Sequence, residues 1–356
     1  MNLIGDYEIL DLSESLKWNE YLHRFPIEQR DIYFTPEYYH LNEELGDGKA
    51  LCFIFKKEDE IGLYPFLLNS VNDLGFNMPN EYFDIQGAYG YNGVLFSTLD
   101  NEFVQTFFDA FESFCANQNI IAEFVRMGFF FNSKFHLREN FSVLFNQKNI
   151  VVNLLNDNIW KDSYEYSTRK NINKALSYNL EFHKNNGEKI SFDHLETFIN
   201  LYKNTMQRNN ADEYYYFNHE YFKNLALFLG TKAFFYFASY NNKMITCEAV
   251  LTNGYNSYSF LGGTDPEYFY LRPNDFLKHC IINDLKTHNG LNYCLGGGTE
   301  GIFRFKKSFS KDGVIDFYIG GKIHNLKVYN EVVSQWEKRY PDKIELHKNL
   351  ILKYRY

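Results

Sequence analysis

Two glycine clusters mark where the backbone of this 356-residue chain could approach a ligand closely. The first, Gly262-Gly263-Thr264, ends a run of strand-forming residues and leads through Asp265 to Arg272-Pro273, where a helix is predicted to begin. A helix N-terminus has free backbone N–H groups, so this turn is predicted to bind an anion, with Arg272 adding a bidentate contact. A plain helix cap after a glycine turn is the structural alternative.

The second cluster, Gly296-Gly297-Gly298, precedes a basic and aromatic segment. Three successive glycines cost conformational entropy, and they are tolerated where a ligand or another backbone comes close. The segment that follows interleaves cations with aromatic rings: Arg304, Phe305, Lys306 and Lys307. Such a composition could clamp a diphosphate or stabilise an oxyanion. A loose loop followed by a helix with solvated lysines is the alternative.

Two further groups of residues are candidates for ligand contacts. Arg169, Lys170 and Lys174 form a basic turn on a predicted helix, and a solvated helix face would look the same. Tyr89 and Tyr91 are flanked by glycines that could expose their hydroxyl groups, and a bulged strand is the competing interpretation.

Composition narrows the class of function. The net charge of −9 argues against a nucleic-acid-binding surface over the whole protein, and no DNA partner is expected. The five cysteines and ten histidines show no zinc-ligand spacing, so no metal is expected. The N-terminal segment lacks the pattern of a signal peptide, and no apolar run is long enough to span a membrane. The expectation is a cytoplasmic protein, with peripheral membrane contact through the basic residues of 343–356 left open.

These candidates require an α/β chain with mixed sheets to position them. In residues 159–356 the pattern predicts helices at 162–177, 192–206, 219–229, 274–287 and 326–339, with strands at 233–240, 244–252, 258–261, 291–295 and 314–319. In residues 1–158 it predicts a helical and irregular start over 1–45, strands at 50–56 and 61–68, a helix at 101–118, and a hairpin over 142–155. The two halves repeat one order loosely, which indicates an internal duplication.

Taken together, the ordered motifs resemble the FemA/FemB/FemX-like branch of the GNAT acyltransferase superfamily. The resemblance spans roughly residues 50–330 and rests on four segments. In chain order they are Tyr89-Gly90-Tyr91-Asn92-Gly93, the series Arg169, Ile172, Lys174 and Ala175, the segment Tyr215-Tyr216-Phe217, and Gly296 to Gly298 with Phe305-Lys306-Lys307-Ser308-Phe309. The family has tandem GNAT-like domains, which implies two such domains here, residues 1–158 and 159–356.

The resemblance implies transfer of an acyl group to an amine in an acyltransferase, with acyl-CoA or aminoacyl-tRNA as donor. Lys306 matches the family lysine implicated in binding substrate or stabilising charge. In a GNAT-like sheet the donor carbonyl lies where two strands splay apart, here the strands that end at Gly263 and Gly298. Asp265 or Glu248 could accept the amine proton, and both could instead be structural.

Three functions are considered, two of them enzymatic and the third from another class. The first is an N-acyltransferase acting on an amine of a small-molecule or lipid-linked cell-envelope precursor, of the amino sugar or peptidoglycan type. The second is aminoacyl-tRNA-dependent ligation to a peptidoglycan precursor, for which tRNA would be a partner. The third is a sugar-nucleotide or peptide-binding module that kept the fold without the chemistry.

Overall fold

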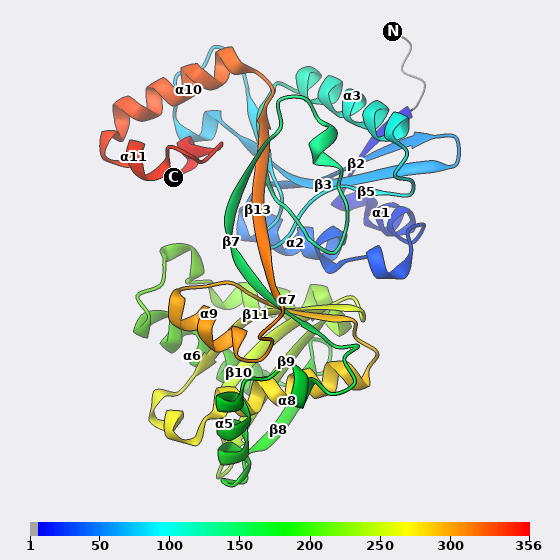
Figure 1. Cartoon of the computed structure of the whole chain (residues 1–356). Coiled ribbons are helices and arrows are strands. Elements are labelled where there is room, and N and C mark those ends of the chain that lie inside the picture. Colours follow the sequence, from blue (N-terminus) through cyan, green and yellow to red (C-terminus); the bar gives the residue numbers. More distant parts are fainter. Residues whose placement is uncertain (1–5) are drawn as a thin grey trace. The chain divides into compact units, whose positions relative to one another are not determined.

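The computed structural model describes residues 6–356, which form two compact units (Figure 1). Unit 1 comprises Met1–Asn146 with Phe317–Tyr356, and unit 2 comprises Gln147–Asp316. The chain therefore returns to unit 1 after leaving it, whereas the predicted domains divide once, between residues 158 and 159. The reason is that strand β13 (Val314–Ile323) pairs with β6 (Ile120–Arg126), and the helix after β13 packs in the core of unit 1.

Unit 1 is a mixed sheet with helices. Its strand order is β1-β2-β3-β4-β6-β13, in which β4 and β6 are parallel and the other neighbours are antiparallel. The remaining strands are β1 (Asp6–Asp11), β2 (Lys49–Lys57), β3 (Glu60–Ser70), β4 (Phe83–Gln86) and β5 (Leu95–Phe96), which pairs with β3. The helices are α1 (Ser15–Leu22), α2 (Pro36–Leu45), α3 (Asn101–Asn117), α10 (Leu326–Arg339) and α11 (Ile344–His347).

Unit 2 contains the segments that carry most of the candidate residues. Its strand order is β7-β12-β11-β10-β9-β8, antiparallel except for the parallel pair β11 and β12. The strands are β7 (Ser142–Asn153), which begins in unit 1, β8 (Glu181–Asn186), β9 (Ala233–Tyr240), β10 (Lys243–Thr252), β11 (Asn256–Thr264) and β12 (Asn292–Gly296). The helices are α4 (Ile159–Asp162), α5 (Tyr166–Leu176), α6 (Phe192–Arg208), α7 (His219–Leu229), α8 (Pro273–Thr287) and α9 (Glu300–Lys307).

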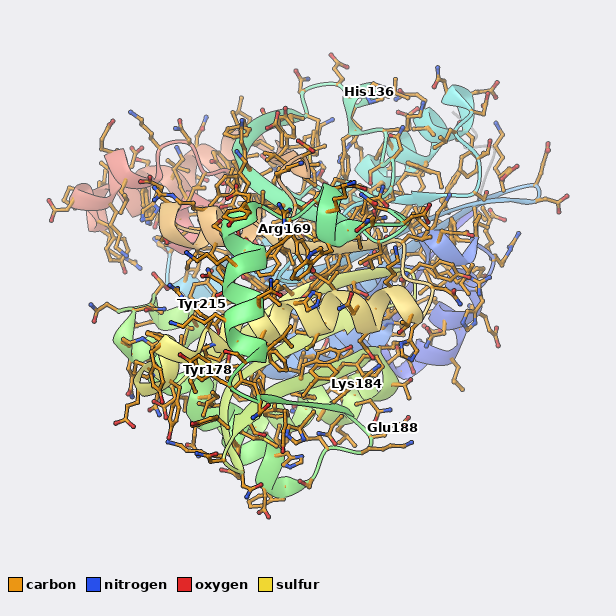
Figure 2. The ribbon with its side chains drawn as sticks, turned by 60° about the horizontal axis from the view of Figure 1, so that its bottom comes forward. His136, Arg169, Tyr178, Lys184, Glu188 and Tyr215 are labelled. Carbon is orange, nitrogen blue, oxygen red and sulfur yellow. The ribbon has the colours of Figure 1, made fainter. Side chains whose placement is uncertain are left out.

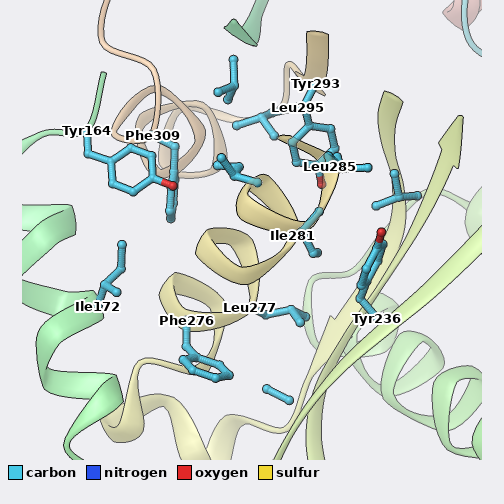
Figure 3. Packing of buried hydrophobic residues seen from close by; sticks show 14 of the residues in the cluster. Tyr164, Ile172, Tyr236, Phe276, Leu277, Ile281, Leu285, Tyr293, Leu295 and Phe309 are labelled. Atoms are coloured by element: carbon cyan, nitrogen blue, oxygen red, sulfur yellow. The ribbon is translucent and has the colours of Figure 1, made fainter. Parts of the chain in front are cut away.

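Consecutive side chains of β9 point to opposite faces of the sheet of unit 2, and their contacts show which helix covers each face. Phe235 and Phe237 contact Phe198 of α6, with ring centroids 5.2 and 6.3 Å apart. Tyr236, between them, lies in the same buried cluster as Leu277 of α8 (Figure 3). Because side chains alternate across a strand, α6 and α8 cover opposite faces. Ser191 caps α6 by accepting a hydrogen bond from the backbone of His194, which fixes where the helix begins.

Three local predictions were wrong. Residues 6–11, predicted to be helical or irregular, form β1, an outer strand paired with β2. Instead of the predicted hairpin over 142–155, residues 142–153 form the single strand β7, in which the side chain of Gln147 donates to that of Asn149. Gly262 and Gly263 are residues of β11 rather than of a turn after it. Among residues 6–356, no helix combines the length and the apolar character needed to cross a membrane.

Candidate active site

The parallel strands β11 and β12 pair over only a short stretch. Their register is Asn256 with Asn292, Ser257 with Tyr293 and Tyr258 with Cys294, and no further pair follows. Strand β11 continues alongside β10 as far as Thr264, while β12 ends at Gly296, whose φ of 72° turns the chain toward α9. The two strands therefore open into a gap within the sheet, at the place predicted to hold a donor carbonyl, and that role remains a prediction.

A cavity of about 280 Å³ lies at this gap, entirely within unit 2. It is lined from both faces of the sheet, by α6 on one side and by α8 and α9 on the other. The residues that line it are Thr205, Arg208, Asn209, Thr246, Cys247, Glu248, Ser259, Gly262, Gly263, Thr264, Phe269, Asn274, Leu277, Lys278, Ile302, Phe305 and Lys306.

Gly263 explains how α6 comes so close to the gap. A Cβ atom at this position would lie 2.2 Å from the carbonyl oxygen of Leu201, so only glycine permits this approach. The same approach lets Thr205 accept a hydrogen bond of 3.0 Å from the backbone N–H of Thr264, whose N–H faces α6. The first glycine cluster therefore serves close packing of backbone on backbone.

A buried ionic network forms the floor of the cavity. The Lys278 ammonium donates to both carboxylate oxygens of Glu248, each at 2.5 Å, to Tyr293 Oη at 3.1 Å and to Ser259 Oγ at 3.3 Å. Tyr293 donates its hydroxyl proton to Glu248. Burial lowers the pKa of Lys278 although Glu248 opposes this, and burial raises the pKa of Tyr293. Four elements thus meet at one charged pair, β10, β11, β12 and α8.

Lys306 enters the same cavity from α9. Its ammonium donates a hydrogen bond of 2.7 Å to the carbonyl oxygen of Gly297, which ties α9 to the second glycine cluster. Burial, reinforced by the positive charge of Lys278, lowers the pKa of Lys306 to about 8. Near neutral pH this amine can exist in both protonation states, which suits it to electrostatic stabilisation or to proton transfer.

Comparison with known proteins assigns this unit to a family. The family model described as "Acetyltransferase (GNAT) domain" matches residues 163–307. Those residues are a GNAT domain. The match includes every residue that lines the cavity, together with Tyr293 and the second glycine cluster. No curated protein compared with the chain matches it.

Solved structures extend the likeness to both units. A structure titled FemX shares 13% identity, with a TM-score of 0.67 over 91% of this chain and 99% of that one. The C-terminal domain of a putative lysylphosphatidylglycerol synthetase from Agrobacterium fabrum shares 10%, with a TM-score of 0.54 over 93% and 96%. A tandem GNAT protein from the clavulanic acid biosynthesis pathway shares 7%, with a TM-score of 0.50 over 90% and 99%. The predicted mixed α/β fold and the resemblance to the FemX-like branch are confirmed at the level of the fold.

The other residues of the basic segment make different contacts from those of Lys306. Arg304 forms an exposed ion pair of 2.7 Å with Glu300, one helical turn away. The ring of Phe305 packs 5.3 Å from that of Phe309 and also lines the cavity. Lys307 lies next to Lys306 on α9 but not among the lining residues. Of the predicted cations in this segment, Lys306 is therefore the one placed at the gap.

Asp265 and Glu248, the two predicted proton acceptors, have different surroundings. Asp265 accepts a hydrogen bond from the backbone of Glu267 and pairs with Lys243 at 2.9 Å. Burial alone would raise the pKa of Asp265, but Lys243 and the Glu267 N–H lower it below its usual value. Asp265 lines a separate groove with residues of α6. Glu248 lines the cavity and accepts hydrogen bonds from Lys278 and Tyr293, and its role as a proton acceptor remains a prediction.

The anion site predicted at the N-terminus of α8 remains a prediction, and the side chains of the first turn bond to other parts of the chain. Pro273 supplies no N–H there, and Asn274 accepts hydrogen bonds from the hydroxyls of Thr246 and Thr264 at 2.9 and 2.6 Å. Asp275 is buried against Asn171, and burial raises the pKa of its carboxyl. Arg272 is exposed, in a left-handed conformation, and its side chain makes no capping bond.

The remaining predicted contacts lie away from the cavity. On α5, the Arg169 guanidinium donates to the backbone oxygens of Trp160, Lys161 and Tyr164, at 3.3, 3.4 and 2.6 Å (Figure 2). The Lys174 ammonium lies 6.0 Å from the centre of the ring of Tyr178, which follows α5 in the turn after the helix. Both residues therefore have local structural roles, and their predicted contact with substrate remains a prediction.

Tyr89 and Tyr91 belong to unit 1, where their loop fills the end of the parallel pair β4 and β6. Asn92, the residue after Tyr91, donates a hydrogen bond from its backbone N–H to the carbonyl oxygen of Arg126. The Arg126 side chain donates to Gly90 at 3.0 Å and stacks 5.4 Å from the Tyr89 ring. The ring of Tyr91 packs 5.4 Å from that of Phe317. The predicted role of these tyrosines in substrate binding is still a prediction.

Sequence analysis missed Lys278, Tyr293 and Arg208. A signal existed for Lys278, because it stands on the buried stripe of α8 with Leu277 and Ile281, where a lysine needs a partner. Arg208, at the end of α6, donates to Thr264 O at 3.1 Å and stacks 5.4 Å from the Phe269 ring. Among the described residues, no three potential metal ligands come together.

Proposed function

We propose that the chain is an N-acyltransferase that moves an acyl or aminoacyl group to an amine of a cell-envelope precursor. The observation that carries the proposal is the cavity at the opening of β11 and β12, with the Lys306 amine inside it and a GNAT domain around it. A donor carbonyl bound in this gap would lie in the cavity that Lys306 lines, where the lysine can meet developing negative charge.

The cavity supports access for two substrates. The sheet is open between α6 on one face and α8 with α9 on the other, so a donor and an amine can reach one carbonyl from different sides. Arg208, Lys278 and Lys306 outnumber Glu248 among the charged lining residues, which favours ligands that carry negative charge. An envelope precursor of the phosphorylated-sugar or lipid-linked type would meet this requirement.

The α8 N-terminus favours an aminoacyl ester as donor over coenzyme A. A coenzyme A diphosphate needs free backbone N–H groups at this position, and here Pro273 lacks one while the buried Asp275 carboxyl lies in the first turn. The fold is also shared with FemX and with a domain named as a putative lysylphosphatidylglycerol synthetase. Aminoacyl-tRNA is therefore the donor that we favour for this transfer, and acyl-CoA is the alternative donor.

Thermal protection of the purified chain distinguishes the donors. Acetyl-CoA and an aminoacylated tRNA are each added over a concentration series, with uncharged tRNA and desulfo-CoA as matched controls. We expect the charged tRNA to raise the melting temperature more than uncharged tRNA does. Protection by acetyl-CoA instead would assign an acyl-CoA donor. If neither donor protects, both enzyme proposals fail, and a binding module becomes the better account.

A further inference from the structure

The buried pair of Lys278 and Glu248 has no role yet in the proposed reaction. Lys278 is 5% exposed and Glu248 is 9% exposed, and each sits at the wall of the cavity. Removing two charges from water is costly, and hydrophobic side chains of similar size would often be no less stable there. A charged pair at the floor of a ligand cavity is therefore a candidate for a functional role.

The contacts of Lys278 exclude it from direct chemistry. Its ammonium carries three N–H donors, and these face Glu248, Tyr293 and Ser259. Tyr293 also donates to Glu248, so both members of the pair are bonded to groups of the chain itself. We therefore ask whether Lys278 and Glu248 act on the reaction through another residue of the cavity.

That neighbour is Lys306, the other lysine on the cavity wall. Lys306 differs from Lys278 because, within residues 6–356, its amine donates one hydrogen bond, to the carbonyl oxygen of Gly297, so its other two N–H groups can reach a ligand. The charged and titratable groups around it are Lys278 from α8, Glu248 from β10 and Cys294 from β12. Arg208 lines the same cavity from α6, and Arg304 and Lys307 flank Lys306 on α9.

We propose that Lys278 is a positioning residue: Glu248, Ser259 and Tyr293 hold its positive charge at the wall of the cavity that Lys306 also lines, and this charge acts on the proton transfers of the Lys306 amine. The inference rests on the proposed acyl transfer. The amine nitrogen of the acceptor forms a bond to the donor carbonyl carbon and loses one proton to neutral Lys306. The bond from that carbon to the donor oxygen or sulfur then breaks, and Lys306 returns the proton to this leaving group.

Site-resolved labelling tests the assignment without any substrate. The whole chain is pulsed with acetic anhydride at a series of pH values, and acetylation of Lys306 is measured by mass spectrometry, normalised to the exposed Lys311. Anhydride reacts with the neutral amine, so the midpoint of labelling reports the protonation of Lys306. For the unmodified protein we expect a midpoint near pH 8.

Two substitutions should move this midpoint in opposite directions. Lys278→Gln removes the neighbouring positive charge, so the protonated form of Lys306 gains stability and the midpoint rises, by about one pH unit. Glu248→Gln removes the compensating negative charge, so the midpoint falls. The double variant Glu248→Gln/Lys278→Gln leaves no uncompensated buried charge, and it serves if either single variant fails to fold. Its midpoint should still rise, because Lys278 affects the pKa of Lys306 more than Glu248 does. The rise should be smaller than in Lys278→Gln, because the opposing charge of Glu248 is removed as well.

An unchanged midpoint in Lys278→Gln and in the double variant would overturn the assignment, as would a shift of both single variants in the same direction. The result is separable from the proposed function. If the midpoints move as expected but no donor is used, acyl transfer fails and the assignment of Lys278 stands. If acyl transfer is found but the midpoints stay fixed, the assignment fails alone.

Discussion

Replacing Gly263 by alanine tests whether the contact of α6 with β11 shapes the cavity. The added Cβ would lie 2.2 Å from the carbonyl oxygen and 2.4 Å from the carbonyl carbon of Leu201, and 2.6 Å from the nitrogen of Tyr202. All three are backbone atoms, so no side-chain rotation relieves the clash. A carbon needs about 3 Å or more from such atoms, so α6 would have to retreat by about 1 Å.

The cost follows from this displacement. Forcing one extra carbon into a packed contact typically costs about 1–3 kcal/mol, and the hydrogen bond from Thr264 to Thr205 would lengthen at the same time. Gly301→Ala is the matched control, because a Cβ there meets nothing within 4 Å and the residue lies in the exposed helix α9. We expect that control to be neutral or to stabilise the protein by up to about 1 kcal/mol.

Urea denaturation gives the free energy of unfolding, and hydrogen exchange of the α6 peptide gives the local effect. We expect Gly263→Ala to lose stability and to exchange faster over residues 192–208, while Gly301→Ala does neither. Equal stability of Gly263→Ala and the unmodified protein, with unchanged exchange in α6, would refute the packing argument.

Three further predictions concern the lysines of the cavity. Lys306→Ala should lower the rate of acyl transfer by about 10²-fold or more, whereas Lys307→Ala should change the rate little. The amide product is quantified by mass spectrometry, and equal losses of rate in the two variants would argue against a special role for Lys306. Lys306→Met should be more stable than the unmodified protein at pH 7, because the lowered pKa of about 8 means that the folded state holds this proton at a cost. That advantage should shrink as pH rises from about 8 toward 10.5, where the unmodified protein gains stability by losing the proton, and a constant advantage in urea titrations would contradict it. Lys278→Met should cost about 3–5 kcal/mol because it leaves the Glu248 carboxylate unpaired, and adding Glu248→Leu should recover most of that loss; no recovery would count against a coupled pair.

Much of unit 2 was predictable from local pattern. The helices at α6, α7 and α8 and the strands at β9 and β10 follow from strong apolar periodicity and were placed within a few residues. Strand β8 was missed because its sequence, Glu-Phe-His-Lys-Asn-Asn, is polar, as suits an outer strand. Strand β7 was divided because Gln147 and Asn149 resemble a turn, although Asn149 is fully buried.

The candidate site was predicted only in part, for a physical reason. Gly263, Glu248 and Lys306 stand near recognisable motifs, and they do line one cavity. Lys278 and Tyr293 reach it through tertiary packing that no local pattern describes. Asp265 and Arg272 looked equally suitable in sequence, but one caps the segment after β11 and the other points to solvent. Residue type and spacing suggest candidates, whereas partners decide which side chains remain available.

The most direct test of the central claim is detection of the product. The purified chain is incubated with an amino-bearing envelope precursor and with either an aminoacylated tRNA or an acyl-CoA, and mass spectrometry follows the precursor. The account predicts a new amide on the precursor, formed with one of the two donors and lost in Lys306→Ala while Lys307→Ala retains it. An amide that forms equally with Lys306→Ala would contradict the assigned site, and no amide with any donor and precursor would contradict the proposed function.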